Sequence, residues 1–136
     1  MKLIPLSEEQ AEDIENRLSA YDGHHMRRRL EGQIRLGIEE DGKLIAGLDA
    51  CVTAFRILYV STVFVDEAYR RKGVGTALMR GMEKRAAAMG VDTIRLDTFD
   101  WQGKAFYEAL GYEIVGHYEN RADGYAEYFF LKRLNA

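Results

Sequence analysis

Apolar residues recur at helical spacing in three stretches of the chain, and glycines mark the ends of those stretches. In the first stretch, Ser7 can cap a helix while the side chain of Gln10 reaches back to its backbone. The second and third stretches stop at Gly90 and Gly111, because glycine adopts the left-handed conformation that ends many helices. We therefore expect three helices, covering residues 7 to 21–23, 75–90 and about 102–110.

The stretches between these helices carry strand-like runs of apolar and β-branched residues. The first two runs are joined by Glu40-Asp41-Gly42, a strong turn signal, and with the third they predict an antiparallel meander. The six predicted strands cover residues 33–39, 43–52, 57–65, 91–98, 112–118 and 125–131. This order of helices and strands predicts a mixed α/β fold.

Length and composition favour one domain, residues 1–136, with a core of its own. The chain is 47% hydrophobic, and no stretch rich in Ser, Gly or charge is long enough to be a linker. Nothing near Met1 has the apolar core of a signal peptide, and no apolar run approaches bilayer length. We therefore expect a cytoplasmic protein with no membrane partner.

Charge and metal-ligand residues argue against two further classes. The net charge of -3 disfavours nucleic acid as a partner, and the basic run at 24–29 is flanked by acids and lacks stacking aromatics. The three histidines are not spaced for ligation with acidic or sulfur partners. The single cysteine, Cys51, lies in a strand-like apolar context. We expect no metal and no covalent enzyme intermediate.

The stretch from Val63 to Thr76 is the most informative, because a strand pattern changes there into a basic, glycine-spaced loop and then into a helix. Gly73 and Gly75 lack Cβ atoms, so the backbone can turn tightly and point successive N–H groups at one anion. The helix that follows adds the positive end of its dipole. A tight surface turn is the alternative. The predicted pyrophosphate-binding residues are Arg70, Arg71, Lys72, Gly73, Val74, Gly75 and Thr76.

A second motif, Tyr107-x-x-x-Gly111-Tyr112, lies beyond the strand that follows the loop motif Arg70-x-x-Gly73-x-Gly75. In this order the two motifs resemble the GNAT superfamily of acyl-CoA-dependent N-acetyltransferases, and the similarity spans roughly residues 43–133. The resemblance implies the GNAT fold, a mixed and mainly antiparallel central sheet flanked by helices. It also implies acetyl-CoA as co-substrate and transfer of the acetyl group to a primary amine by direct attack in a ternary complex.

By this resemblance, the strand before the loop splays from its neighbour and offers main-chain groups near Val63 and Val65 to the pantetheine arm of the coenzyme. A fixed backbone N–H near Phe64 or Val65 would stabilise the negative charge that develops on the thioester oxygen. Tyr107 matches the family's helix tyrosine and would donate a proton or a hydrogen bond to the departing thiolate. Aromatic packing is the alternative for this side chain.

The attacking amine must lose a proton, and a carboxylate usually accepts it, directly or through water. Asp97 is the first candidate, because it ends the strand after the coenzyme-binding helix, where open α/β sheets place ligands. It also interrupts a core-like pattern. Acceptance of hydrogen bonds from the next loop explains Asp97 equally well.

Three questions stay open in the sequence. A module that binds coenzyme A without chemistry, engaging a partner through the basic residues 24–29, would share the same fold. The acceptor amine can belong to a small molecule, a peptide or a protein. The aromatic-rich last strand can complete the core or pair with a second subunit in a homodimer.

Overall fold

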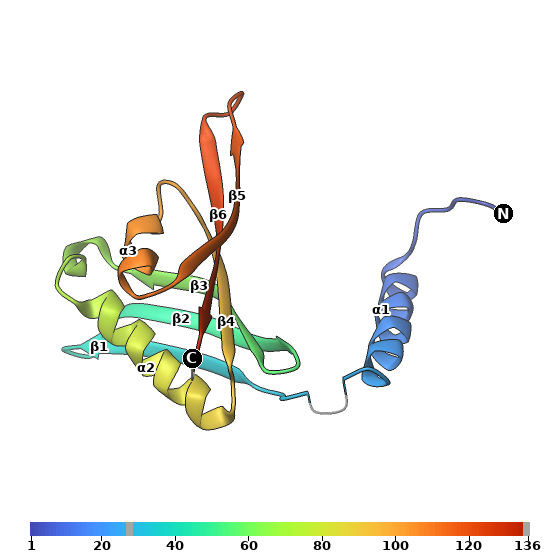
Figure 1. Ribbon diagram of the computed structural model, residues 1–136, viewed down its shortest axis with the longest axis horizontal. Coiled ribbons are helices and arrows are strands. Elements are labelled where there is room, and N and C mark those ends of the chain that lie inside the picture. The colour runs from blue at the N-terminus through green and yellow to red at the C-terminus, as the bar shows by residue number, and fades with distance from the viewer. Residues whose placement is uncertain (27–28, 135–136) are drawn as a thin grey trace.

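The computed structural model describes residues 1–26 and 29–134 and confirms the predicted order of elements (Figure 1). The basic run at 24–29 is only partly covered, because Arg27 and Arg28 lie outside the described residues. The elements are α1 (Glu8–Gly23), β1 (Gln33–Glu40), β2 (Lys43–Ala54), β3 (Ile57–Val65), the 3-10 turn η1 (Glu67–Tyr69), α2 (Val74–Met89), β4 (Thr93–Phe99), α3 (Lys104–Ala109), β5 (Glu113–Asn120) and β6 (Tyr125–Arg133).

The two helices that pack on the sheet end in the same way, and this moves the following strands from their predicted starts. Gly90 and Gly111 adopt positive φ angles of 99° and 93°. The next N–H groups then reach back into the helix, from Val91 to the Ala86 carbonyl at 3.0 Å and from Tyr112 to the Tyr107 carbonyl at 3.1 Å. Because those N–H groups close the helices, β4 and β5 begin one or two residues later than expected.

The six strands form one sheet in the order β1-β2-β3-β4-β6-β5. Every neighbouring pair is antiparallel except β3 and β4, which run parallel and pair only between Ile57–Tyr59 and Thr93–Arg95. Since β3 continues to Val65 and β4 to Phe99, the two strands separate beyond that short junction. The expected mixed, mainly antiparallel sheet is confirmed.

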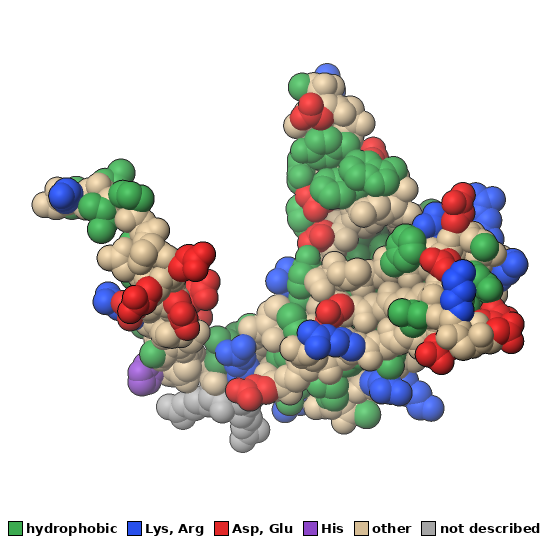
Figure 2. All heavy atoms as spheres, turned by 180° about the vertical axis from the view of Figure 1, so that it is seen from behind, with side chains coloured by type: hydrophobic (Ala, Val, Ile, Leu, Met, Phe, Trp, Pro, Cys, Tyr) green, Lys and Arg blue, Asp and Glu red, His purple; other side chains and the backbone are tan. Residues whose placement is uncertain are grey.

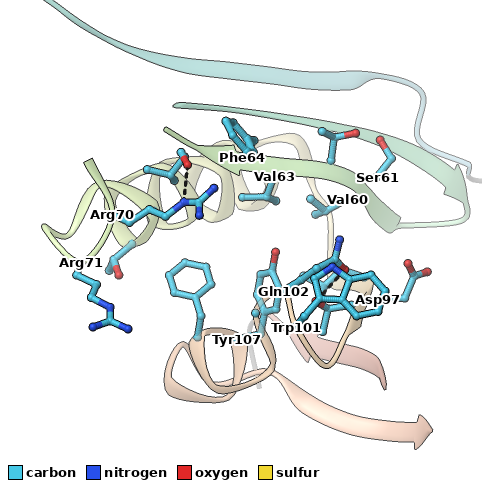
Figure 3. Close-up of a pocket in the computed structure, with 18 of the residues that line it drawn as sticks. Val60, Ser61, Val63, Phe64, Arg70, Arg71, Asp97, Trp101, Gln102 and Tyr107 are labelled. Atoms are coloured by element: carbon cyan, nitrogen blue, oxygen red, sulfur yellow. Dashed lines mark hydrogen bonds between the residues drawn. The ribbon is translucent and has the colours of Figure 1, made fainter. Parts of the chain in front are cut away.

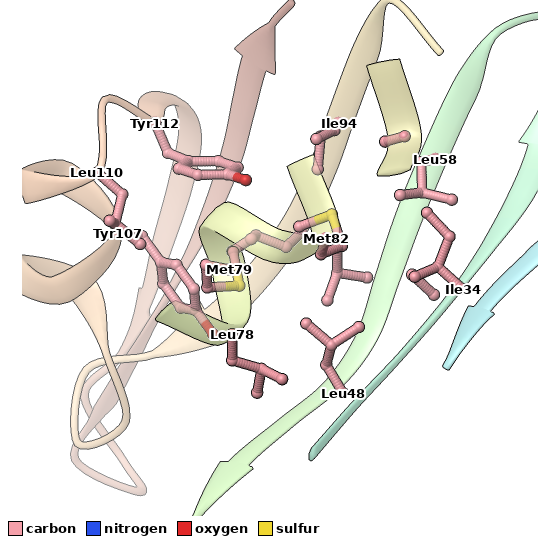
Figure 4. Packing of buried hydrophobic residues seen from close by; sticks show 14 of the residues in the cluster. Ile34, Leu48, Leu58, Leu78, Met79, Met82, Ile94, Tyr107, Leu110 and Tyr112 are labelled. Atoms are coloured by element: carbon pink, nitrogen blue, oxygen red, sulfur yellow. The ribbon is translucent and has the colours of Figure 1, made fainter. Parts of the chain in front are cut away.

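The core lies between α2 and one face of the sheet, where α3 also packs (Figure 4). Met79 and Met82 of α2 are fully buried against apolar side chains of the sheet, among them Leu58, Ile94 and Phe130. Phe130 shows that the last strand completes the core on this side, while its neighbour Phe129 is 37% exposed on the other.

A buried carboxylate joins α2 to the second half of the sheet. Glu83 accepts hydrogen bonds from Tyr112 Oη at 2.8 Å and from Lys132 Nζ at 3.1 Å, and Arg80 adds a third contact at 2.9 Å. Lys132 also donates to the Leu110 carbonyl at the end of α3 at 2.8 Å. Burial, together with the Glu83 carboxylate, raises the pKa of Tyr112 above that of a free phenol. The cluster therefore fixes α3 against both layers.

α1 forms as predicted, with the reciprocal cap between Ser7 and Gln10, but it stands apart from the sheet in Figure 1. No residue of α1, all of which the structure describes, is buried. Within the described residues, no helix is long and apolar enough to cross a membrane.

Candidate active site

The separation of β3 from β4 opens a cleft of about 800 Å³ (Figure 3). One wall is β3, the other is the end of β4 with the loop that follows it, and the starts of α2 and α3 close one end. Ten predicted site residues line this cleft: Val63, Phe64, Val65, Arg70, Arg71, Gly73, Gly75, Thr76, Asp97 and Tyr107. Lys72 and Val74 are not among its lining residues; the Lys72 ammonium lies 5.7 Å from the Tyr69 ring centre.

The loop between β3 and α2 turns sharply before the helix starts. Arg71 and Gly73 adopt left-handed conformations, with φ of 61° and 81°. Gly73 is the N-cap of α2, and within the described chain no side chain caps this helix or places an acidic group in its first turn. The first N–H groups of α2 are therefore left for an anion, which the helix dipole also favours.

The Arg70 side chain is fixed against the end of β3. Its Nε donates to the Val65 carbonyl at 2.8 Å, which Figure 3 marks, and its guanidinium lies 5.4 Å from the centre of the Phe64 ring. This bond holds the loop beside the cleft. Arg71, which is exposed on the cleft lining, is left as the loop cation that faces a ligand.

The backbone of β3 presents alternate residues to the cleft. The Asp66 N–H donates to the Ile45 carbonyl of β2 at 2.8 Å, and Phe64 pairs with Gly47 on the same strand. Because successive N–H groups of a strand point in opposite directions, Phe64 bonds toward β2 while Val63 and Val65 point their backbone groups into the cleft. Of the two N–H groups expected near the thioester oxygen, the geometry thus favours that of Val65.

Gly75 allows α2 and α3 to approach closely at the closed end of the cleft. A Cβ atom at Gly75 would lie 3.1 Å from Cζ of Phe106, which is tighter than an ordinary contact. Gly73, by contrast, has open space around its Cβ position and needs glycine for its positive φ. The two glycines of the motif therefore serve different purposes.

Tyr107 combines a buried ring with a hydroxyl that points into the cleft toward β3 (Figure 3). The ring is 9% exposed and packs against Phe106, Tyr112 and Phe130. No residue in the described ranges bonds to the hydroxyl. Burial raises the pKa of Tyr107 to about 12, so the phenol stays protonated at neutral pH. Packing and a polar role are therefore compatible in this residue.

Asp97 lies on the opposite face of the sheet from Tyr107. Its neighbours Leu96 and Thr98 are buried toward the core, so the exposed Asp97 projects from the other side of β4. There it accepts a hydrogen bond from Tyr59 Oη at 3.0 Å, and Arg95 lies over the Tyr59 ring at 4.4 Å. Burial and the bond to Asp97 raise the pKa of Tyr59. In place of the hydrogen bond expected from the following loop, Asp97 thus accepts one from Tyr59 of β3.

The rim beside Asp97 holds residues that sequence reasoning did not assign. Trp101 is 68% exposed and stacks flat on Phe99, with ring centres 4.7 Å apart. The Gln102 side chain accepts from the Phe99 N–H at 2.8 Å and shapes the loop. Tyr59 is the partner of Asp97. The sequence signal for it was the alternation in residues 57–65, which places Tyr59 on the sheet face away from the core.

The donors and the shape of this cleft suit a phosphate-bearing ligand. Among residues 1–26 and 29–134, no cluster of three or more His, Cys, Asp or Glu is placed to hold a metal. The uncapped start of α2 suits a pyrophosphate, and the close approach at Gly75 keeps the adjoining wall free of side-chain bulk.

Comparison with known proteins gives a consistent picture. Residues 3–112 match the model of the Acetyltransferase (GNAT) family. The chain is 29% identical over 108 residues to the blasticidin-S acetyltransferase of Streptomyces morookaense, which covers 79% of each protein. It is 36% identical over 58 residues to the L-ornithine N5-acetyltransferase NATA1 of Arabidopsis thaliana, but this segment is 41% of the chain and only 25% of that relative's length.

A crystal structure of an acetyltransferase from Bacillus cereus superposes with a TM-score of 0.90 at 27% identity, covering 98% of both chains. Because residues 1–26 are 26 of the 136 residues, a TM-score of 0.90 over 98% of both chains requires that most of these residues superpose as well. The position of α1 relative to the sheet is therefore shared by the two structures.

Proposed function

This chain belongs to the GNAT acetyltransferase family, and we propose that it transfers the acetyl group of acetyl-CoA to a primary amine of a small molecule by direct attack in a ternary complex. The observation that carries the proposal is the uncapped start of α2 at the end of a cleft between two separated strands. A helix start suits the pyrophosphate, and the free backbone of β3 suits the amides of the pantetheine arm.

The coenzyme side of the site is built from backbone. The N–H groups of the first turn of α2, with Arg71 beside them, bind the pyrophosphate. Val63 offers its N–H and carbonyl groups along the open side of β3, and Val65 its N–H, since the Val65 carbonyl accepts from Arg70; an amide-bearing chain bonds there like an added strand. Apolar side chains suffice at both positions because the backbone does the binding.

Three groups divide the chemistry of the transfer. As the amine nitrogen bonds to the thioester carbon, the Val65 N–H stabilises the negative charge on the carbonyl oxygen. As the carbon–sulfur bond breaks, the Tyr107 hydroxyl donates a hydrogen bond to the departing thiolate; a phenol with a pKa of about 12 is a weaker acid than a thiol and keeps its proton. Asp97 takes the proton of the amine, directly or through a water molecule.

The acceptor side of the cleft favours a cationic amine joined to a planar or apolar group. Asp97 supplies the negative charge, and the exposed face of Trp101 offers an aromatic surface that attracts cations. Two relatives are named for small amines, blasticidin-S and L-ornithine, which supports the choice of a small molecule over a peptide or protein.

Calorimetric titration of acetyl-CoA into the wild type and into Gly73→Glu tests the coenzyme site. We expect micromolar binding in the wild type and its loss in the variant, because a carboxylate would project at the start of α2. Gly124→Glu is the matched control: Gly124 has a similar φ of 72° and open surroundings, and it lies in the turn between β5 and β6, away from the cleft. No binding to the folded wild type would contradict the proposal.

Turnover separates the proposed enzyme from a module that only binds coenzyme A. Release of free thiol from acetyl-CoA is followed in the presence of a panel of small cationic amines, with Tyr107→Phe as the catalytic control. Turnover that falls in Tyr107→Phe with the acetyl-CoA affinity preserved supports the transferase. Tight coenzyme binding without turnover on any amine supports the module.

A further inference from the structure

We propose that residues 1–26 form an arm that docks on the open sheet face of a second copy, and that the exchange of two such arms makes a symmetric dimer. The open sheet face is the face of the sheet away from α2 and α3. Figure 1 shows both helices on the other face, with α1 standing away from all six strands. The exchange rests on the uncovered sheet face and on the separated α1, and it is independent of the proposed acetyl transfer.

The α1 helix of the arm has an apolar side, yet none of its residues is buried. It carries a reciprocal helix cap, and Ile14, Leu18 and Tyr21 form one apolar side of the helix. A lone helix of this length is marginal in water, so its stability needs a partner surface. Apart from Met26, which is partly buried, its large apolar side chains are exposed, with exposed fractions of 49% or more: Met1, Leu3, Ile4, Leu6, Ile14, Leu18 and Tyr21.

The open sheet face offers a continuous surface for such a helix. Strand register places one residue from each strand in a single row across this face: Gln33, Cys51, Tyr59, Arg95, Leu131 and Glu113. Phe129 and Tyr118 lie beside it, with ring centres 6.1 Å apart. Figure 2, seen from behind, shows this side of the molecule and the space between the arm and the hairpin of β5 and β6.

The exposed surface of the chain is too large for a compact monomer. A monomer of 15.5 kDa exposes about 7,200 Å² by the usual scaling, whereas this chain exposes 9987 Å². The excess is far more than the ~800 Å² that each partner buries in a standard interface, and 26 arm residues match the ~20–30 that one side contributes. The arm alone is therefore large enough to hold two copies together.

Hydrogen bonds fix the point at which the chain enters β1, and α1 lies away from the sheet of its own chain in Figure 1. The Leu30 N–H donates to the Phe55 carbonyl at 2.9 Å, and the Gly32 carbonyl accepts from the Val52 N–H at 3.0 Å, so the segment before β1 is tied to the turn between β2 and β3. The same arm position in the Bacillus cereus crystal structure described above shows that it is not peculiar to this sequence. A second copy is the surface that an outward arm meets.

Sedimentation velocity and the reactivity of Cys51 test the exchange together. Cys51, the only cysteine, belongs to the row on the open sheet face, so a docked arm slows its reaction with a thiol reagent. We expect a dimer for the wild type, and a monomer with faster Cys51 labelling for the double variant Ile14→Asp and Leu18→Asp. The matched control, Asn16→Asp with Ser19→Asp, adds the same charges on the opposite side of α1 and stays dimeric.

Two results would overturn the exchange. One is a wild type that is monomeric at tens of micromolar; the other is a double variant that stays dimeric with unchanged Cys51 labelling, which would place the interface elsewhere. If the aspartate variant does not fold, Ile14→Ala with Leu18→Ala is used instead, and its dimer dissociation constant rises by about 10-fold or more if the arm carries the contact.

Discussion

Asp97 and Tyr107 line one cleft from opposite faces of the sheet. The carboxylate projects from β4 on the open sheet face, and the phenol reaches the cleft from the core side, through α3. The short junction of β3 with β4 makes this possible, because beyond it the two strands leave a gap that both faces share. In the proposed reaction, acetyl-CoA would therefore enter on the side of α2 and the amine on the side of Asp97, so that the two substrates meet between the strands.

Substitution of Asp97 is expected to affect the amine and not the coenzyme. Asp97→Asn should lower kcat/KM for the amine by roughly 10²-fold, as the loss of a general base does, with acetyl-CoA binding nearly unchanged. Tyr59→Phe removes only the hydrogen bond to Asp97 and should cost less. Steady-state kinetics with both substrates varied measures both effects. An equal fall in the affinity for acetyl-CoA would contradict the assignment of Asp97 to the acceptor side.

Closer packing at Gly75 should weaken coenzyme binding while the fold persists. Gly75→Ala pushes the Phe106 ring away from α2, and we expect up to about tenfold weaker acetyl-CoA binding, or ~1.4 kcal/mol. Gly81→Ala in the same helix is the control, because its Cβ would meet Leu36 at 3.9 Å, an ordinary contact. That control should instead stabilise the protein by ~0.5–1 kcal/mol. Calorimetry measures the affinity for acetyl-CoA, and thermal melting measures the stability. Equal affinity in Gly75→Ala and Gly81→Ala would exclude a steric effect of the Gly75 Cβ on coenzyme binding.

The free energy of unfolding above pH 10 should depend on the ionisation of Tyr107. Its pKa is raised to about 12 by burial, whereas in the unfolded chain it is near the ordinary value of 10.0. Between those values the unfolded state releases this proton first, so the stabilisation present below pH 10 is lost as the pH rises toward 12. Between pH 9 and pH 11 the wild type should lose about 1–1.5 kcal/mol more than Tyr107→Phe. Denaturant unfolding at pH 9, 10 and 11 measures the difference; parallel curves would disprove it.

Removal of the Glu83 carboxylate should destabilise the fold severely. In Glu83→Ala, Lys132 keeps a charge on a side chain only 19% exposed and loses its carboxylate partner. Breaking a buried pair in this way costs about 3–5 kcal/mol. Glu108→Ala breaks the exposed pair with Lys104 and should cost less than about 1 kcal/mol. Urea denaturation of both variants provides the test, and similar losses would mean that the Glu83 cluster contributes no more than a surface ion pair.

Local patterns were sufficient to predict the elements of this fold. The cap at Ser7, the turn at Asp41-Gly42 and the stops at Gly90 and Gly111 are each encoded within a few residues, and the structure has all of them. The loop residues on the cleft lining were also predicted, because their glycine spacing is local.

Interactions between distant residues could not be predicted in the same way. Tyr59 and Asp97 are 38 positions apart, and their bond depends on the register of β3 with β4. Glu83 resembles any charged helix residue until Tyr112 and Lys132 are placed around it. The helical period of α1 was visible in the sequence, but the exposure of all its residues depends on how the rest of the molecule folds.

The short junction between β3 and β4 also divides the sheet mechanically. On one side lie β1, β2 and β3, on the other β4, β6 and β5, and only three residues of each central strand pair across the boundary. Few hydrogen bonds resist a change in the angle between these two halves. A ligand that contacts both walls of the cleft would restrain this change of angle. Amide hydrogen exchange along β3 and β4 should therefore slow when the ligand binds.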